Sequence, residues 1–143
     1  MTVGEIHERI LELDDLLVRA DMGQISMEWE EYQALVEEAD GLMNLLAKTT
    51  SDLNGKSYEE MYTLFAKQRI INRMSAIAER HVELHPESNP KDDAIVAAAF
   101  EGINNGTKTP EQGMHECMSI FAYLVEDGPK PPRVGFFGRL FSR

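Results

Sequence analysis

Hydrophobic residues near the start of the chain repeat at alternating spacings of three and four, in two successive stretches. The two repeats are Val3, Ile6, Ile10, Leu13 and Leu17, followed by Trp29, Tyr32, Val36, Ala39, Met43 and Leu46. This spacing gathers apolar side chains on one face of a helix. Because only a short stretch around Gly23 separates the repeats, we predict two helices, residues 2–22 and 26–48, that pack as an antiparallel hairpin.

Capping residues predict where three further helices begin. Ser57 opens the third helix with a capping box, and the helix is expected to end before Pro86. Asn89 and Pro90 suit the first positions of the fourth helix. Thr109 opens the fifth helix with a second box of the same kind.

These elements lead to expectations about a connection, the place of the fourth helix and the fold class. Residues 49–56 are polar and contain an Asn-Gly turn signal, so we expect a connection there. The fourth helix is apolar over most of its surface and is expected to be central. No alternating β-branched runs predict strands. We therefore predict an all-α fold of about five helices, with an acidic helical bundle over residues 1–128 that is built on the N-terminal hairpin.

The C-terminal tail, residues 129–143, differs in composition from the bundle. Pro129, Pro131 and Pro132 favour an extended spacer. The residues behind it that we predict to bind a partner are Phe136, Phe137, Arg139, Leu140, Phe141 and Arg143. Three arrangements stay open: docking to another protein chain or a neighbouring copy, packing on the chain's own bundle, and contact with a membrane. We do not expect membrane contact, because anionic headgroups repel an acidic bundle.

Charge is distributed unevenly along the chain, whose formal net charge is −11. Residues 1–50 carry 12 acidic and 3 basic side chains, whereas residues 127–143 have a net charge of +3. This balance argues against direct binding of nucleic acid, which requires a basic surface. It also raises an alternative function, that of an acidic inhibitor (an immunity protein or nucleic-acid mimic) that covers the basic site of a nuclease or DNA-binding protein.

Basic residues cluster in the third predicted helix, where Lys67, Arg69, Arg73 and Arg80 have no acidic residue between positions 61 and 78. The arginines fall close to one stripe of the helix, which would suit a phosphorylated or nucleotide ligand. The other interpretation is that they pair with carboxylates of the first two helices or of a second subunit. The sequence favours this pairing, since the acidic hairpin precedes them directly.

Signatures of catalysis and of metal binding are absent from the sequence. His81 and His85 have a spacing that could reach one metal ion, but the general base of a zinc protease is missing, so we expect a capping or exposed role. Cys117 falls on an apolar stripe and is interpreted as a core residue. We therefore expect no enzyme activity, no metal and no cofactor.

The sequence leads to one main functional hypothesis. We expect a cytoplasmic, non-enzymatic interaction or adaptor protein that forms homo-oligomers and docks through its basic-aromatic tail onto a protein partner or a neighbouring subunit. The expected location follows from an acidic N-terminus unlike a signal peptide and from the absence of a bilayer-spanning apolar run.

Overall fold

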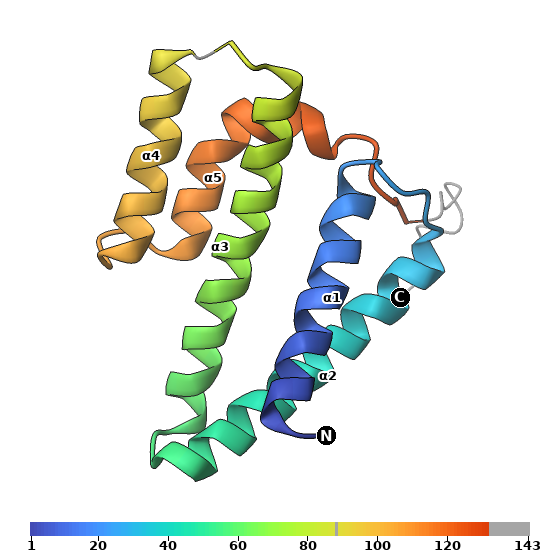
Figure 1. Cartoon of the computed structure of the whole chain (residues 1–143), viewed down its shortest axis with the longest axis vertical. Helices are drawn as coiled ribbons and strands as arrows, with labels where there is room; N and C mark the ends of the chain where they lie inside the picture. Colours follow the sequence, from blue (N-terminus) through green and yellow to red (C-terminus); the bar gives the residue numbers. More distant parts are fainter. Residues whose placement is uncertain (88, 132–143) are drawn as a thin grey trace, which may run out of the picture.

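The computed structural model describes residues 1–87 and 89–131, which form helices without strands (Figure 1). The elements are α1 (Val3–Asp21), α2 (Trp29–Asn54), α3 (Tyr58–Leu84), α4 (Pro90–Asn104), α5 (Pro110–Phe121) and a short 3-10 helix, η1 (Ala122–Val125). The prediction of an all-α fold with five helices is confirmed. The partner-binding residues predicted between Phe136 and Arg143 lie outside the described residues.

Hydrogen bonds at the caps confirm the predicted starts of α1 and α3. The backbone N–H of Glu5 donates to the Thr2 hydroxyl at 3.1 Å, and the Glu5 carboxylate accepts from the Thr2 N–H. The Ser57 hydroxyl accepts from the N–H of Glu60 at 3.1 Å. These bonds satisfy N–H groups that have no partner within the helix. Helix α2 differs, because it begins at Trp29 instead of residue 26 and its N-cap residue, Glu28, forms no side-chain capping bond.

Helix α2 extends further than its hydrophobic repeat predicts, to Asn54 instead of Lys48. The hydroxyls of Thr49 and Thr50 donate to carbonyls one turn earlier in the helix, at 2.8 and 2.7 Å. The polar side chains are thus satisfied inside the helix, and the chain turns only at Gly55, which has a left-handed φ of 66°. The expected connection therefore shortens to a few residues.

Helix α3 is the longest element and carries a helical pair against each of its ends (Figure 1). Helix α2 packs on its N-terminal half and α5 on its C-terminal half, whereas α1 runs beside it far enough for Val18 to join the C-terminal cluster. Two buried clusters correspond to these contacts. The first contains Ile6, Ile10, Met43 and Leu46. The second contains Val18, Met74, Ile77, Ala99, Ile103, Cys117, Phe121 and Leu124.

The expected central position of α4 is wrong. This helix lies at the edge of the bundle and packs against α5 (Figure 1). Ala99, Gly102 and Ile103 are buried, whereas Ala94, Ala97 and Ala98 are exposed. An alanine methyl gains little from burial compared with a leucine or isoleucine side chain, so an alanine-rich face can stay in water at small cost.

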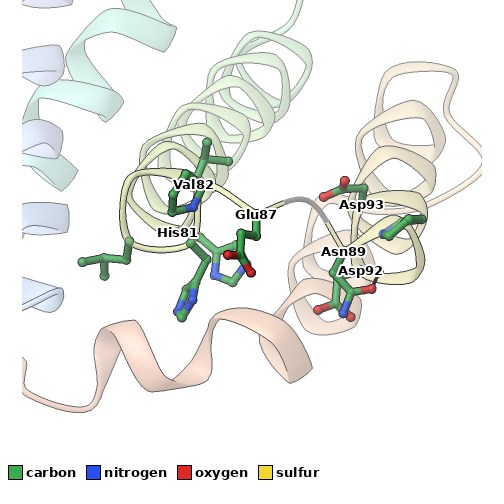
Figure 2. Close-up of a pocket in the computed structure, with 10 residues that line it drawn as sticks. His81, Val82, Glu87, Asn89, Asp92 and Asp93 are labelled. Carbon is green, nitrogen blue, oxygen red and sulfur yellow. Dashed lines mark hydrogen bonds between the residues drawn. The ribbon is translucent and has the colours of Figure 1, made fainter.

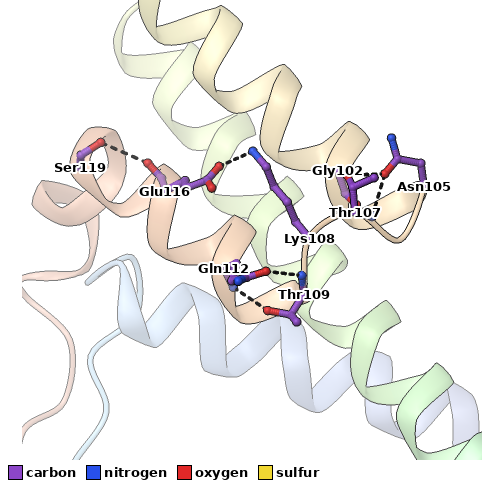
Figure 3. Close-up of polar contacts among 8 residues, drawn as sticks. All are labelled: Gly102, Asn105, Thr107, Lys108, Thr109, Gln112, Glu116 and Ser119. Carbon is purple, nitrogen blue, oxygen red and sulfur yellow. Dashed lines mark hydrogen bonds and ion pairs between the residues drawn. The ribbon is translucent and has the colours of Figure 1, made fainter.

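Polar contacts close the turn between α4 and α5 (Figure 3). The Thr107 hydroxyl donates to the Asn105 side-chain oxygen at 2.7 Å, and Gln112 and Thr109 form a capping box. Lys108 reaches across to Glu116 at 2.5 Å. These contacts hold the short turn together, so that α4 packs against α5.

Candidate functional site

Two arginines of the predicted basic stripe bind carboxylates of α1. The guanidinium of Arg69 donates two hydrogen bonds to the Asp14 carboxylate, at 2.9 and 2.7 Å. Asp40 of α2 lies 3.9 Å from the same guanidinium. The hydrogen bonds to Asp14 are the main reason that the pKa of Arg69 is raised. Arg69 therefore ties α3 to the hairpin, as the pairing interpretation expects.

Asp21, the last residue of α1, joins three helices. Its carboxylate accepts hydrogen bonds from Arg73 of α3 and, at 2.6 Å, from the hydroxyl of Tyr32 of α2. Asp21 is only 8% exposed, so both partners are needed to offset the cost of burying its charge. Burial and the bond to Asp21 raise the pKa of Tyr32 to about 12.

The four predicted ligand-binding residues are not brought into one site. Arg80 bonds to Glu83 of its own helix at 3.0 Å. Lys67 lines a separate shallow recess with Glu60 and Leu64. Only Arg69 and Arg73 share a cavity, and both already bind carboxylates there. Binding of a phosphorylated ligand by the stripe stays a prediction, and such a ligand would have to displace these acids.

The cavity that Arg69 and Arg73 share is a cleft of about 320 Å³ between α1, α2 and α3, which we call the three-helix cleft. Its lining residues are Asp14, Leu17, Val18, Tyr32, Val36, Ala66, Arg69, Ile70 and Arg73. Val36, Ala66 and Ile70 are half-buried, so apolar atoms face the opening. The sequence pattern assigned Tyr32 and Val36 to the hairpin seam. It could not show that α3 crosses the hairpin and leaves an opening beside them.

Residues 127 and 128 pack beside Asp21, whose carboxylate binds two residues that line this cleft. The chain runs from η1 to the α1–α2 connection, where Gly128 packs on the backbone of Asp21 and Asp127 packs on Gly23 (Figure 1). A Cβ atom on Gly128 would lie 2.9 Å from the Asp21 carbonyl oxygen. Contact this close needs glycine, so the segment that leads into residues 132–143 starts from a defined place on the bundle.

A wider recess of about 890 Å³ lies between the end of α3 and the start of α4 (Figure 2). His81 and His85 line it from α3 and its C-terminal cap, Glu87 lies beside His81, and Asp92 lines it from the start of α4. The His81 Nδ1 atom is 2.6 Å from the hydroxyl of Tyr123, and the two imidazole centroids are 5.1 Å apart. Among the described residues, no three or more His, Cys, Asp or Glu side chains are grouped closely enough to hold a metal ion. The histidines thus form part of an aromatic cluster at the end of α3.

The outer faces of α1 and α2 carry exposed carboxylates. Arg9 binds Glu38 through two hydrogen bonds, at 2.7 and 3.1 Å, which lower the pKa of that carboxyl. Several other exposed acids of the hairpin form no ion pair within the part of the chain described, and we single out four of them. They are Glu8, Glu30, Glu31 and Glu37, which we call the acidic face.

Comparisons with known protein families, with curated proteins and with solved structures find no match to this chain. Along residues 1–87 and 89–131, no helix has both the length and the apolar character required to cross a bilayer. Function is therefore argued from geometry and chemistry alone.

Proposed function

We propose that this protein is a cytoplasmic, non-enzymatic interaction protein that docks through residues 132–143, which we call the docking segment, onto a partner chain or a neighbouring copy. The observation that carries the proposal is that Gly128, four residues before this segment, packs closely on Asp21. The sequence that follows contains three phenylalanines and three arginines.

Burial of aromatic anchors supplies the binding energy in this proposal. A phenylalanine or leucine side chain gains about 1.5–3 kcal/mol when it is fully buried. Ordering of the segment and loss of rigid-body freedom take back a large part of that gain. A single segment then binds weakly, and several segments on an oligomer bind far more tightly through their effective concentration. The arginines guide the encounter with the partner.

The test compares the full chain with a chain that ends at Pro131, which keeps the Gly128 contact intact. Pull-downs from cell extract and the mass in solution are measured for both proteins. We expect the truncated chain to lose its partners or its self-association while its melting temperature stays within a few degrees. A variant with Phe136, Phe137 and Phe141 changed to serine serves as the matched full-length control. Unchanged partners and unchanged mass would contradict the proposal.

The acidic face favours a second candidate, an inhibitor of a basic nuclease or DNA-binding protein. Glu8, Glu30, Glu31 and Glu37 have no cationic partner within the described residues. Carboxylates held on a rigid hairpin can accelerate association with a basic surface, and high salt weakens that effect. Partner binding that collapses with salt, and that survives deletion of the docking segment, would favour the inhibitor.

A further inference from the structure

We propose that the three-helix cleft is an internal acceptor for the docking segment of the same chain. The inference rests on the proposed function, because the segment that binds a partner would also bind the bundle that carries it. Without a partner, a phenylalanine of the segment occupies the cleft. A partner then competes with the cleft for the same side chain.

The path of the chain before the docking segment supports this contact. Gly128 packs on Asp21, and the Asp21 carboxylate accepts the hydroxyl of Tyr32, which forms a wall of the cleft. Gly128, four residues before the segment, thus packs on a residue that contacts this wall. Phe136 lies five residues beyond Pro131, a reach of roughly 17 Å in extended chain. The whole segment spans up to roughly 40 Å, which exceeds the length of about 28 Å for the 19 residues of α1.

The aliphatic lining of the cleft suits an aromatic side chain. Leu17, Val36, Ala66 and Ile70 present aliphatic surface around a space of about 320 Å³. Covering this surface with an aromatic ring removes apolar area of both groups from water. The segment is the most aromatic part of the chain, with three of its six phenylalanines.

The docking segment and the hairpin have opposite charges. The docking segment carries three arginines and no acid, and residues 1–50 have a net charge of −9. Asp40, whose side chain is 61% exposed, lies beside the cleft next to Arg69. The two cations that line the cleft are already neutralised by Asp14 and Asp21. They therefore do not repel the incoming arginines.

The covalent connection makes even a weak contact effective. A short linker holds its two ends at an effective concentration in the millimolar range. A segment with only submillimolar affinity would therefore occupy its own cleft for most of the time. The same connection favours the cleft of the same chain over that of a second copy at low protein concentration.

Trp29 is a built-in reporter for this contact. It is the only tryptophan of the chain, and its ring stacks on Tyr32 at a centroid distance of 5.7 Å. We would compare the full chain with the chain that ends at Pro131, by tryptophan emission and by amide chemical shifts. We expect a shift of Trp29 emission on truncation and amide changes gathered at Leu17, Val36 and Ile70. Phe136→Ser with Phe137→Ser should reproduce them in the full chain.

Matched variants separate the cleft from other apolar surface. Val36→Ser should shift Trp29 emission toward that of the truncated chain, whereas Leu45→Ser, at an exposed leucine of the same helix, should not. Amide changes that are absent, or that lie away from the cleft, would overturn the inference. Changes that appear only at high concentration, together with a doubled mass, would also overturn it, because the acceptor would then be a second copy.

The failure of this inference can be told apart from failure of the proposed function. If the segment binds partners in pull-downs and leaves the cleft signals unchanged, the internal acceptor is wrong and the docking function stands. If the cleft signals respond and truncation alters no partner, the segment packs on its own bundle and the docking function is wrong. If the docking function and the internal acceptor are both correct, Val36→Ser should increase partner capture severalfold, because the cleft then competes less well for the segment.

Discussion

The hydroxyl of Tyr32 donates a 2.6 Å hydrogen bond to the carboxylate of Asp21 across the connection between α1 and α2. Arg73 of α3 binds the same carboxylate. One buried acid therefore joins the three helices that surround the cleft. The geometry of the cleft depends on this group, and so do the first two predictions.

Asp21→Asn should destabilise the protein by about 2 kcal/mol, because Arg73 loses its charged partner and the buried amide cannot replace it. Asp15→Asn is the matched control, since Asp15 is exposed and lies 3.8 Å from Arg19. An exposed pair of this kind contributes within about 0.5 kcal/mol. Urea denaturation measures both changes. Equal effects of the two substitutions would show that the Asp21 contacts add little.

Tyr32→Phe should cost about 1 kcal/mol near neutral pH, through loss of its hydrogen bond. The pKa of Tyr32 is raised to about 12, so the folded state favours the protonated phenol. This contribution is complete below pH 10, where a free tyrosine is still protonated, and is lost as the pH rises through 12. The stability difference between wild type and Tyr32→Phe should therefore shrink between pH 10 and 12. A constant difference across that window would contradict the bond to Asp21.

Two glycine-to-alanine substitutions should have opposite signs. A Cβ atom on Gly113 of α5 would lie 2.3 Å from the Cδ1 atom of buried Ile103. Gly113→Ala should cost about 1–2 kcal/mol, because overpacking outweighs the better helix propensity of alanine. Gly41 of α2 has nothing within 4 Å of its Cβ position, so Gly41→Ala should gain about 0.5–1 kcal/mol. Urea midpoints that move in the same direction would contradict the close approach of α4 and α5.

Cys117 should react slowly with thiol reagents in the folded protein. Its side chain is fully buried, and burial, assisted by Glu116, raises the pKa of the thiol. Since the thiolate is the reactive form, both effects slow the reaction. Ellman's reagent at pH 8 should label Cys117 much faster in urea than in buffer. Rapid labelling of the native protein would place this residue on an accessible surface.

Local chemistry accounts for the parts of the fold that the sequence predicted. The capping residues Thr2, Ser57, Asn89 and Thr109 form hydrogen bonds with neighbours three residues away or less, so their effect is readable without tertiary structure. The apolar repeat of α1 is confirmed in the same way, since Ile6, Ile10, Leu13 and Leu17 are buried. The preference for pairing of the basic stripe also agrees with Arg69 on Asp14 and Arg73 on Asp21.

Hydrophobicity alone did not reveal which apolar faces find a partner. Helix α4 has an apolar surface that suits a central helix, yet it lies at the edge and packs mainly against α5, where Gly113 of α5 comes close to Ile103. Leu64 of α3 is a large apolar side chain that is 53% exposed, although Phe65 next to it packs on a buried cluster. Periodicity identifies one face of a helix but carries no information about the crossing position of its neighbours.

The sequence by itself determined that the chain is helical, where most helices begin, and how charge divides between an acidic bundle and a basic end, because each of these depends on residues close together in the chain. Tertiary structure decided that Asp21 meets Arg73, that Gly128 meets Asp21, and that a cleft opens beside Tyr32 and Val36. These relationships join residues that lie in different helices, and they depend on the angles at which the helices pack.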